Sequence, residues 1–374
     1  MPSTPGHLIR LLVWLLLALV GAGLAVWSWP GEGDQPVYPG RHWSWMAPER
    51  AGYSAAKLNA FSRHTGGSGC IAYQGRMIYA WGDWAARGDV ASVAKPLYAF
   101  LAYKAVEQGR IGSLDDLVAD WVPDNTALDE YLKKIAGPIT FRQLLDQTSG
   151  YGLEESPGEA FAYNDYATYL CAWLLFDRVW EYPEADNDAV LNGELLGGSI
   201  GFEDQPTIQH RQSRPFRLRI SSRDLARFGL LYLRGGRWRK ATLLRADLFA
   251  SHMHSALPAD FPRTSGEEDE LLPEARTVGG DKDEKHHLGS LGQFWWFNRV
   301  TPDGHRLLPD APEDTFFGSG YGGRFALLVI PSQELVVAWQ DIYPDEDWIP
   351  LDETGRHRLN QTIRALLAAR VPAE

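Results

Sequence analysis

Cysteine is scarce in this sequence: Cys70 and Cys171 are the only two thiols among 374 residues. Two cysteines are too few for a disulfide scaffold, and too few for a zinc site built mainly on thiolates. They could form a single bridge in an oxidising compartment, and the sequence does not decide whether they do. Small disulfide-rich folds and cysteine-rich metal sites are therefore excluded.

Basic residues are also fewer than acidic residues. The chain carries 36 Lys and Arg residues against 48 Asp and Glu residues, which gives a formal net charge of -12. Proteins that bind nucleic acid neutralise backbone phosphates with a surplus of basic side chains. We therefore expect no nucleic-acid partner.

Long apolar runs are absent except near the N-terminus, where residues 11–29 read LLVWLLLALVGAGLAVWSW. A helix of this length spans about 28 Å, close to the hydrocarbon thickness of a bilayer. Arg10 precedes the run and Glu32 and Asp34 follow it, so the positive-inside rule places the rest of the chain on the periplasmic or extracellular side. The length of the run predicts a membrane anchor; small residues at 21–25 keep cleavage as a signal peptide, followed by secretion, as the alternative.

Three regions follow from the composition. Residues 1–29 are the anchor or signal peptide, residues 30–48 are rich in Pro, Gly and Trp and predict a linker, and residues 49–374 predict one globular domain. Hydrophobic residues make up 45% of the chain and aromatic residues 12%, which is enough apolar surface for a large core.

Both ends of the domain predict strands. Residues 71–81 and 325–340 each contain two β-branched and aromatic runs around a short turn. Between them the pattern is mostly helical. Helices are predicted over residues 96–108, 140–147, 224–234 and 356–370. We expect an α+β fold (an α/β sandwich), in which an antiparallel sheet from the N- and C-terminal strands is flanked by helices and a mostly helical region is inserted at about 106–290.

The strongest chemical signal is a Ser-x-x-Lys motif, SVAK at residues 92–95, directly after the first predicted hairpin. Ser92 and Lys95 lie three positions apart, so a helix places them on one face and lets the amine reach the hydroxyl. A neutral lysine in that place can take the serine proton. The spacing therefore indicates Ser92 as a nucleophile and Lys95 as its base.

Two other serines compete for that role. A second Ser-x-x-Lys motif begins at Ser54, which is better explained as the N-cap of a helix. Residues 197–201 fit the Gly-x-Ser-x-Gly elbow of α/β-hydrolases, with Asp260 or Asp281 and His305 following in order. The polar stretch after them lacks the helix that such an elbow needs, so we interpret residues 197–201 as a glycine-rich loop.

Histidines suggest a metal site only weakly. His252 and His254 lie near Asp260, and His286 and His287 are adjacent, but the chain has no His-x-x-x-His or Cys-x-x-Cys spacing. We interpret these histidines as surface or loop residues and expect no metal and no cofactor.

Further motifs follow the first in order: QTSGY at residues 147–151, YND at 163–165 and GYGGR at 320–324. Together with residues 92–95, this order of motifs resembles the serine beta-lactamase and penicillin-binding-protein superfamily, in particular its class C-like branch of esterases, D-aminopeptidases and amide hydrolases. The resemblance covers nearly all of residues 49–370 and implies the fold described above.

The resemblance also implies roles for single residues. Ser92 is the acylated nucleophile, Lys95 its base partner, and Tyr163 the tyrosine that passes a proton to the leaving group. Asp165 stands where the family has an asparagine. It therefore either contacts the substrate in place of the amide or caps the helix that follows.

Near the C-terminus, Tyr321, Gly322 and Gly323 stand where penicillin-binding members have Lys-Thr-Gly. The missing lysine removes a cation that would hold a substrate carboxylate, which disfavours β-lactam hydrolysis. The glycines would let the backbone approach the acyl group, and the N–H groups of Ser92 and Arg324 are predicted to form the oxyanion hole.

We therefore predict a serine hydrolase that cleaves a small ester or amide through an acyl-enzyme on Ser92. The alternative is a catalytically silent or slowly acylated penicillin-binding or sensing domain of the same fold, which Asp165 and the missing Lys-Thr-Gly motivate. Trp295 and Trp296 are interpreted as core residues that could also border an aromatic acyl pocket. The sequence gives neither the identity of the substrate nor the oligomeric state.

Overall fold

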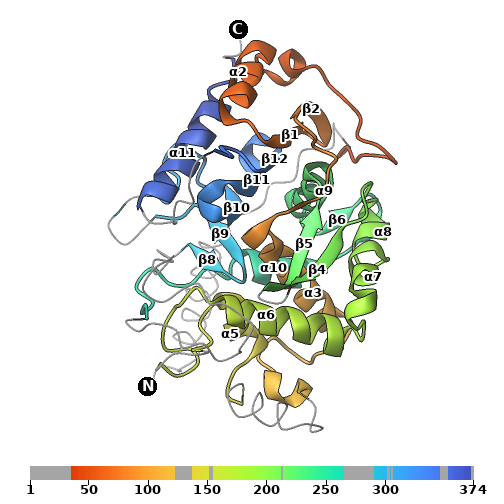
Figure 1. Cartoon of the computed structure of the whole chain (residues 1–374), viewed down its shortest axis with the longest axis vertical. Helices are drawn as coiled ribbons and strands as arrows, with labels where there is room; N and C mark the ends of the chain where they lie inside the picture. The colour runs from red at the N-terminus through yellow and green to blue at the C-terminus, as the bar shows by residue number, and fades with distance from the viewer. Residues whose placement is uncertain are drawn as a thin grey trace, which may run out of the picture. The chain divides into compact units, whose positions relative to one another are not determined.

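A seven-stranded antiparallel sheet organises the structure (Figure 1). The computed structural model describes residues 35–122, 137–150, 155–211, 214–264, 290–300, 304, 306–345 and 353–371. The sheet runs in the order β2-β1-β12-β11-β10-β9-β8. Its strands are β1 (Ser68–Tyr73), β2 (Arg76–Trp81), β8 (Leu291–Gly292), β9 (Trp295–Phe297), β10 (Phe316–Gly320), β11 (Phe325–Ile330) and β12 (Leu335–Gln340).

The two ends of the domain meet in the middle of this sheet. β1 pairs with β12 in register from Ser68 opposite Gln340 to Tyr73 opposite Leu335. The two predicted hairpins are both confirmed, as β1–β2 and β11–β12. The predicted α+β fold, with an antiparallel sheet from the N- and C-terminal strands, is therefore confirmed.

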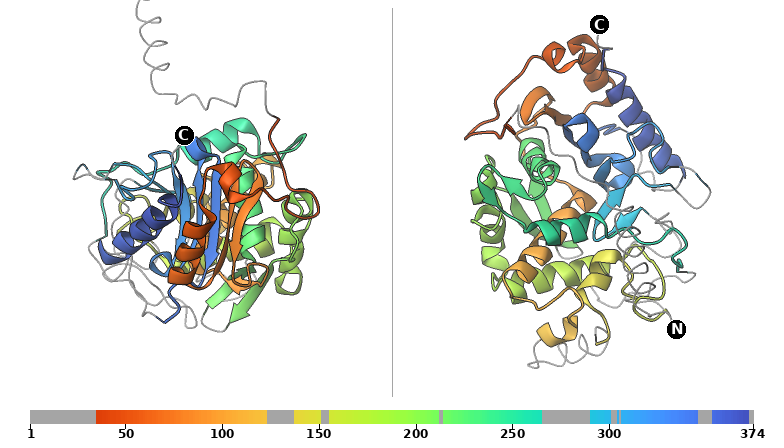
Figure 2. Two further views of the ribbon diagram at one scale, coloured as in Figure 1. Left: turned by 90° about the horizontal axis from the view of Figure 1, so that it is seen from above. Right: turned by 180° about the vertical axis from the view of Figure 1, so that it is seen from behind.

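Helices cover both faces of the sheet, as the view from above shows (Figure 2). On β11, Leu328 and Ile330 pack in the cluster that contains α2 (Ala55–Thr65) and α11 (Glu353–Leu367). Leu327 and Val329 point to the opposite face and pack with α9 (Ser222–Leu233). Because successive side chains of a strand alternate between faces, a strand covered on both sides is apolar at every position. This explains the unbroken apolar run of β11.

The inserted region is mostly helical. It contains α3 (Lys95–Glu107), α5 (Phe141–Asp146), α6 (Asp165–Trp173), which continues as the π-helix η4 (Leu174–Val179), α7 (Asn187–Asn192), α8 (Gly197–Ile200) and α10 (Ala246–Met253). Two small sheets accompany them: β3 (Gly88–Asp89), β5 (Arg214–Ile220) and β4 (Thr207–Arg211) in one, and β6 (Arg237–Trp238) with β7 (Ala241–Thr242) in the other. Single turns of 3-10 helix are η1 (Pro48–Ala51), η2 (Ala91–Ala94), η3 (Val118–Trp121), η5 (Glu184–Asp186), η6 (Tyr321–Gly323) and η7 (Pro331–Gln333).

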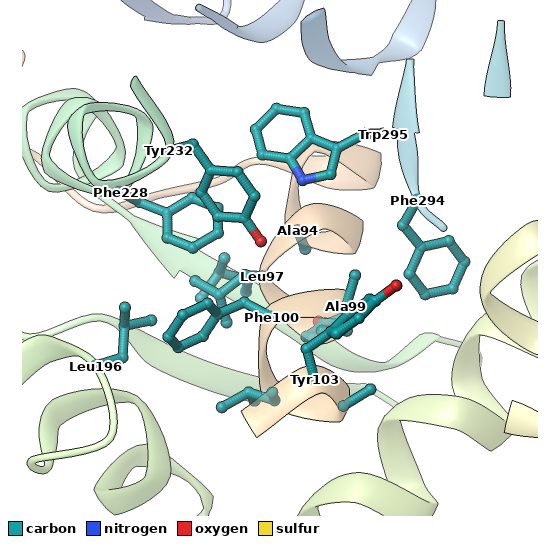
Figure 3. Packing of buried hydrophobic residues seen from close by; sticks show 14 of the residues in the cluster. Ala94, Leu97, Ala99, Phe100, Tyr103, Leu196, Phe228, Tyr232, Phe294 and Trp295 are labelled. Atoms are coloured by element: carbon teal, nitrogen blue, oxygen red, sulfur yellow. The ribbon is translucent and has the colours of Figure 1, made fainter. Parts of the chain in front are cut away.

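Helix α3 is buried along its length, which fits its nearly uniform apolar sequence. The rings of Phe100 and of Phe228 from α9 pack edge to face, with their centres 6.0 Å apart, and Phe228 stacks on Trp295 from β9 (Figure 3). Trp295 is fully buried, as a core residue should be. The helix that begins at Lys95 thereby packs against α9, which in turn packs on the large sheet.

The segment that was expected to be a linker, residues 30–48, packs on the domain from Val37 onward. Trp43 is buried, and the fully buried guanidinium of Arg227 donates hydrogen bonds to the carbonyls of Gly40 and Arg41. A buried guanidinium needs hydrogen-bond acceptors for its N–H groups, and these two carbonyls supply some of them.

The membrane-anchor prediction is corrected. In the part of the chain that the structure describes, no helix is long and apolar enough to cross a bilayer. The run at residues 11–29, on which the prediction of a membrane partner rested, lies outside the described residues.

The two cysteines do not form the bridge that the sequence left open. Cys70 lies in β1 and Cys171 in α6, and both thiols are free and buried. Burial in apolar surroundings raises the pKa of each thiol.

A buried polar cluster joins α3, α5 and α10 to the turn between β8 and β9. Gln293 lies in that turn, where it accepts a hydrogen bond from Tyr103 through its side chain and donates its backbone N–H to Asp146 Oδ1 at 2.9 Å. His252 stacks on Tyr103 and lies 3.2 Å from the Gln293 carbonyl. The prediction that His252 is a surface or loop residue is therefore wrong, and burial lowers its pKa to about 4.

Asp146 is buried within this cluster, and burial raises the pKa of its carboxyl to about 7. The unfolded chain ionises at an ordinary aspartate pKa, so folded protein binds the proton more tightly, and the free energy of unfolding falls as pH rises from about 4 to about 7. Asp146→Asn keeps the acceptor for Gln293 and cannot ionise. We expect it to raise the free energy of unfolding at pH 8 by about 2–4 kcal/mol, and by much less at pH 5, in urea denaturation.

Asp247→Asn is the matched control, since Asp247 is exposed and pairs with Arg245. It should not reproduce the stabilisation at pH 8. An Asp146→Asn effect of equal size at both pH values would contradict the explanation by a buried charge.

Candidate active site

The Ser-x-x-Lys motif lies where the chain leaves the large sheet. Ser92 is in the 3-10 turn η2 and is half-buried, and Lys95 opens α3 with its side chain only 6% exposed. Lys95 Nζ donates a hydrogen bond to Ser92 Oγ at 3.0 Å. The expected proximity of amine and hydroxyl is therefore present, with the serine at the surface and the lysine below it.

A strained turn precedes the serine. Ala91 has φ 51°, in the left-handed region that alanine avoids. The N–H of Ala91 donates a hydrogen bond to Asp89 Oδ1 at 2.9 Å. Arg217 of β5 donates two hydrogen bonds, of 2.8 and 3.0 Å, to the same carboxylate. Although burial opposes the charged form, the hydrogen bonds that Arg217 donates to Asp89 raise the pKa of its guanidinium above the ordinary value. This half-buried pair holds the backbone from which Ser92 projects.

Two residues of the predicted YND element reach Lys95 from the inserted region. Asp165 Oδ1 forms an ion pair with Lys95 Nζ at 3.2 Å. The Lys95 ammonium also lies 4.4 Å from the centre of the Tyr163 ring, within cation–π distance. The structure thus brings Ser92, Lys95, Tyr163 and Asp165 together, although the motifs are separated by about seventy residues.

Gln147 holds this element in place. Its side-chain oxygen accepts from the N–H of Asn164 at 2.7 Å, and its carbonyl accepts from Ala162 at 2.9 Å. Asn164 is the N-cap of α6, since its Oδ1 accepts from Ala167. The possibility that Asp165 caps that helix is therefore wrong, and its carboxylate is left for Lys95.

Strand β10 closes the site from the other side, and sequence reasoning missed its part. A Cβ built on Gly320 would lie 2.9 Å from Ala91 Cβ and 3.2 Å from Ser92 N. A Cβ built on Gly318 would meet Pro96 and Val93 at 3.2 to 3.5 Å. Glycine at both positions lets the strand press against η2. The segment FFGSG, which ends at the first glycine of the GYGGR motif, contains both of these glycines.

The GYGGR motif serves a turn and a packing contact. Gly322 and Gly323 have φ 61° and 93°, so both need glycine for a left-handed backbone. The N–H of Arg324 donates to the Tyr321 carbonyl at 3.1 Å. That N–H is engaged within its own turn, which does not favour its predicted oxyanion role, and the Arg324 guanidinium pairs with Asp341. Tyr321 itself is 37% exposed.

Aromatic rings line the side of the site that Tyr163 forms. Trp296 of β9 stacks on Tyr163 with ring centres 6.5 Å apart, and on Phe317 of β10 at 6.4 Å. Trp296 and its neighbour Trp295 therefore point to opposite faces of the sheet, and Trp296 is the one that borders the site.

The competing sequence hypotheses find no support in the geometry. Ser54 Oγ accepts from the N–H of Lys57 as the N-cap of α2, as predicted. Residues 197–201, expected as a loop, contain the short helix α8, and Ser199 is exposed with its hydroxyl bonded to the Glu194 carbonyl. Within the described ranges no group of three His, Cys, Asp or Glu side chains could hold a metal ion. Asp281, His286, His287 and His305 lie outside the described residues.

The fold and this site together define a class. An antiparallel sheet flanked by helices, with a Ser-x-x-Lys turn packed against a strand and a tyrosine facing the lysine, is the architecture of serine beta-lactamases and penicillin-binding proteins. The beta-lactamase family model matches residues 55–339, so the protein belongs to the beta-lactamase family. The resemblance seen in the sequence is confirmed, and the fold family is one of hydrolases.

Solved structures show the same fold at low identity. A Bacillus anthracis protein assigned as a 6-aminohexanoate-dimer hydrolase has TM-score 0.58 and 15% identity, over 91% of this chain and 91% of that one. A penicillin-binding protein homologue from Caulobacter crescentus has TM-score 0.56 and 14% identity, over 87% and 98%. EstCE1, described as a hydrolase with promiscuous acyltransferase activity, has TM-score 0.54 and 16% identity, over 83% and 98%. No curated protein matches the sequence.

The contact between β10 and η2 yields a test of the site's construction. Gly320→Ala places a methyl group against the backbone of Val90 and Ser92, so we expect it to lower the free energy of unfolding by about 1–3 kcal/mol. Gly318→Ala meets side-chain atoms at ordinary or slightly tight distances and should cost less than about 1 kcal/mol. Thermal denaturation of the two variants measures the difference. Equal losses would show that Gly320 is not packed more tightly against the serine turn than Gly318 is.

Proposed function

We propose that this protein is a serine hydrolase that cleaves a small ester or amide through an acyl-enzyme on Ser92. The observation that carries the proposal is the hydrogen bond of 3.0 Å between Ser92 Oγ and the buried amine of Lys95. An amine that contacts a half-buried serine can accept the hydroxyl proton when it is neutral, and the serine then becomes a competent nucleophile.

The proposed reaction has two halves. Ser92 Oγ attacks the substrate carbonyl and its proton passes to Lys95; the bond to the leaving group then breaks, and the leaving group takes a proton. Tyr163 lies against the Lys95 amine and is the group that we assign to that second transfer. Water attacks the acyl-enzyme in the second half, which releases the acid and restores the serine. No cofactor enters this scheme.

The negative charge on the carbonyl oxygen needs N–H donors. We assign one to Ser92 and place the second at the end of β10, because the backbone of Gly320 approaches the Ser92 nitrogen.

A fluorophosphonate probe and p-nitrophenyl acetate test the proposal on the full chain. We expect the probe to label Ser92 and the ester to turn over. Ser92→Ala should abolish labelling and lower kcat/KM by about 10³-fold or more, and Lys95→Met should do nearly the same because the serine loses its base.

Ser54→Ala is the matched control, because Ser54 belongs to a Ser-x-x-Lys motif that the structure assigns to a helix cap. It should leave labelling and turnover unchanged. Label on another serine would overturn the assignment of Ser92. Absence of both label and turnover would favour the catalytically silent binding domain.

A further inference from the structure

Asp165 is the residue at which this site departs from the asparagine of related enzymes. Its Oδ1 contacts Lys95 Nζ, and its side chain is 18% exposed. Its other oxygen, Oδ2, has no hydrogen-bond partner among the described residues. An asparagine at this position would offer both a donor and an acceptor, whereas a carboxylate only accepts. The open oxygen of Asp165 therefore requires a donor from any group that binds beside it.

Two arginines near the site are already paired with carboxylates. Arg217 is paired with Asp89, and Arg324 with Asp341. The segment of β10 that faces the serine, from Gly318 to Gly320, carries no charge. These two guanidinium groups are therefore engaged by carboxylates, and neither is free to bind an anionic substrate.

The protonation state that the reaction requires of Lys95 also affects the charge balance beside Asp165. Lys95 must be neutral to accept the proton of Ser92, and Asp165 then carries a negative charge that no neighbour in the pair balances. A protonated amine on the substrate would restore neutrality beside the carboxylate. It would also compete with Lys95 for Asp165.

We infer that Asp165 selects substrates that carry a protonated amine near the scissile ester or amide. This inference rests on the proposed function, because it concerns the same site. It names a substrate class: cationic amino esters or amino amides over neutral ones of equal size, and neutral ones over anionic ones.

Matched esters test the preference at pH 7 and low salt. The p-nitrophenyl esters of glycine, β-alanine and 6-aminohexanoate are compared with those of propanoate, butanoate and heptanoate, which replace the amine by a methyl group, and with the succinate monoester. A second pair, 2-aminoethyl butanoate and propyl butanoate, places the amine on the leaving group. We expect kcat/KM to favour the amine by about tenfold in at least one pair, because an ion pair of this exposure has about that strength.

Asp165→Asn keeps the shape of the side chain and should lower that ratio by about tenfold; the readout is the ratio within each pair, because the change also removes the ion pair to Lys95 and so alters the kcat/KM of every ester. Asp247→Asn makes the same change of net charge on an exposed part of α10 and should leave the ratio unchanged. High salt should reduce the ratio in the unmodified protein, as screening weakens the ion pair.

Two different failures can be told apart. If neutral esters are cleaved through Ser92 but no pair shows a preference for the amine, or if Asp165→Asn retains the preference, the inference about Asp165 is wrong and the proposed function stands. If no ester is cleaved and Ser92 is not labelled, the proposed function itself fails.

Discussion

The pairing of β1 with β12 is the constraint on which the rest of the structure depends. It joins strands that are more than 250 residues apart in the chain, so everything between them must leave the sheet and return to it. Closing so long a loop has an entropic cost, and the sheet offsets it by burying apolar side chains on both faces. β11 and β12 show this most clearly, since nearly every position is buried.

The candidate site lies where the chain leaves the large sheet and where it later returns to it. Ser92 and Lys95 stand at the point where the chain leaves the sheet through η2, and β10 is part of the returning segment. Tyr163 and Asp165 come from the inserted helices and reach the same amine. The residues of the candidate site are thus contributed by three separate stretches. Each stretch is held by its own contacts: the Arg217–Asp89 pair behind η2, the glycines of β10, and Gln147 beside the YND element.

What the sequence predicted correctly was local or periodic. The hairpins follow from alternation and turn residues, and Thr140 with Gln143 forms the capping box that the pattern Thr-x-x-Gln indicates. Ser92 and Lys95 were found because a spacing of three residues fixes their distance on a helix. These features depend on neighbours within a few positions.

What the sequence did not predict depends on distant partners. Asp165 could be a helix cap or a substrate ligand by its neighbours alone; only the fold places Lys95 beside it and gives the cap to Asn164. The glycines of β10 matter because η2 packs on them, which no local pattern reveals. His252 was misplaced because its burial is set by Tyr103 and the turn at Gln293, far away in the chain.

The two buried cysteines can report local unfolding of the layers that cover them. Cys70 lies in the central sheet and Cys171 in the inserted helices, both fully buried and each without a disulfide partner. A thiol reagent in solution can therefore react only with molecules in which the surrounding layer has come apart. The relative rates at the two positions say whether the sheet and the helical insertion loosen as one cooperative unit or separately, and no label needs to be introduced to find out.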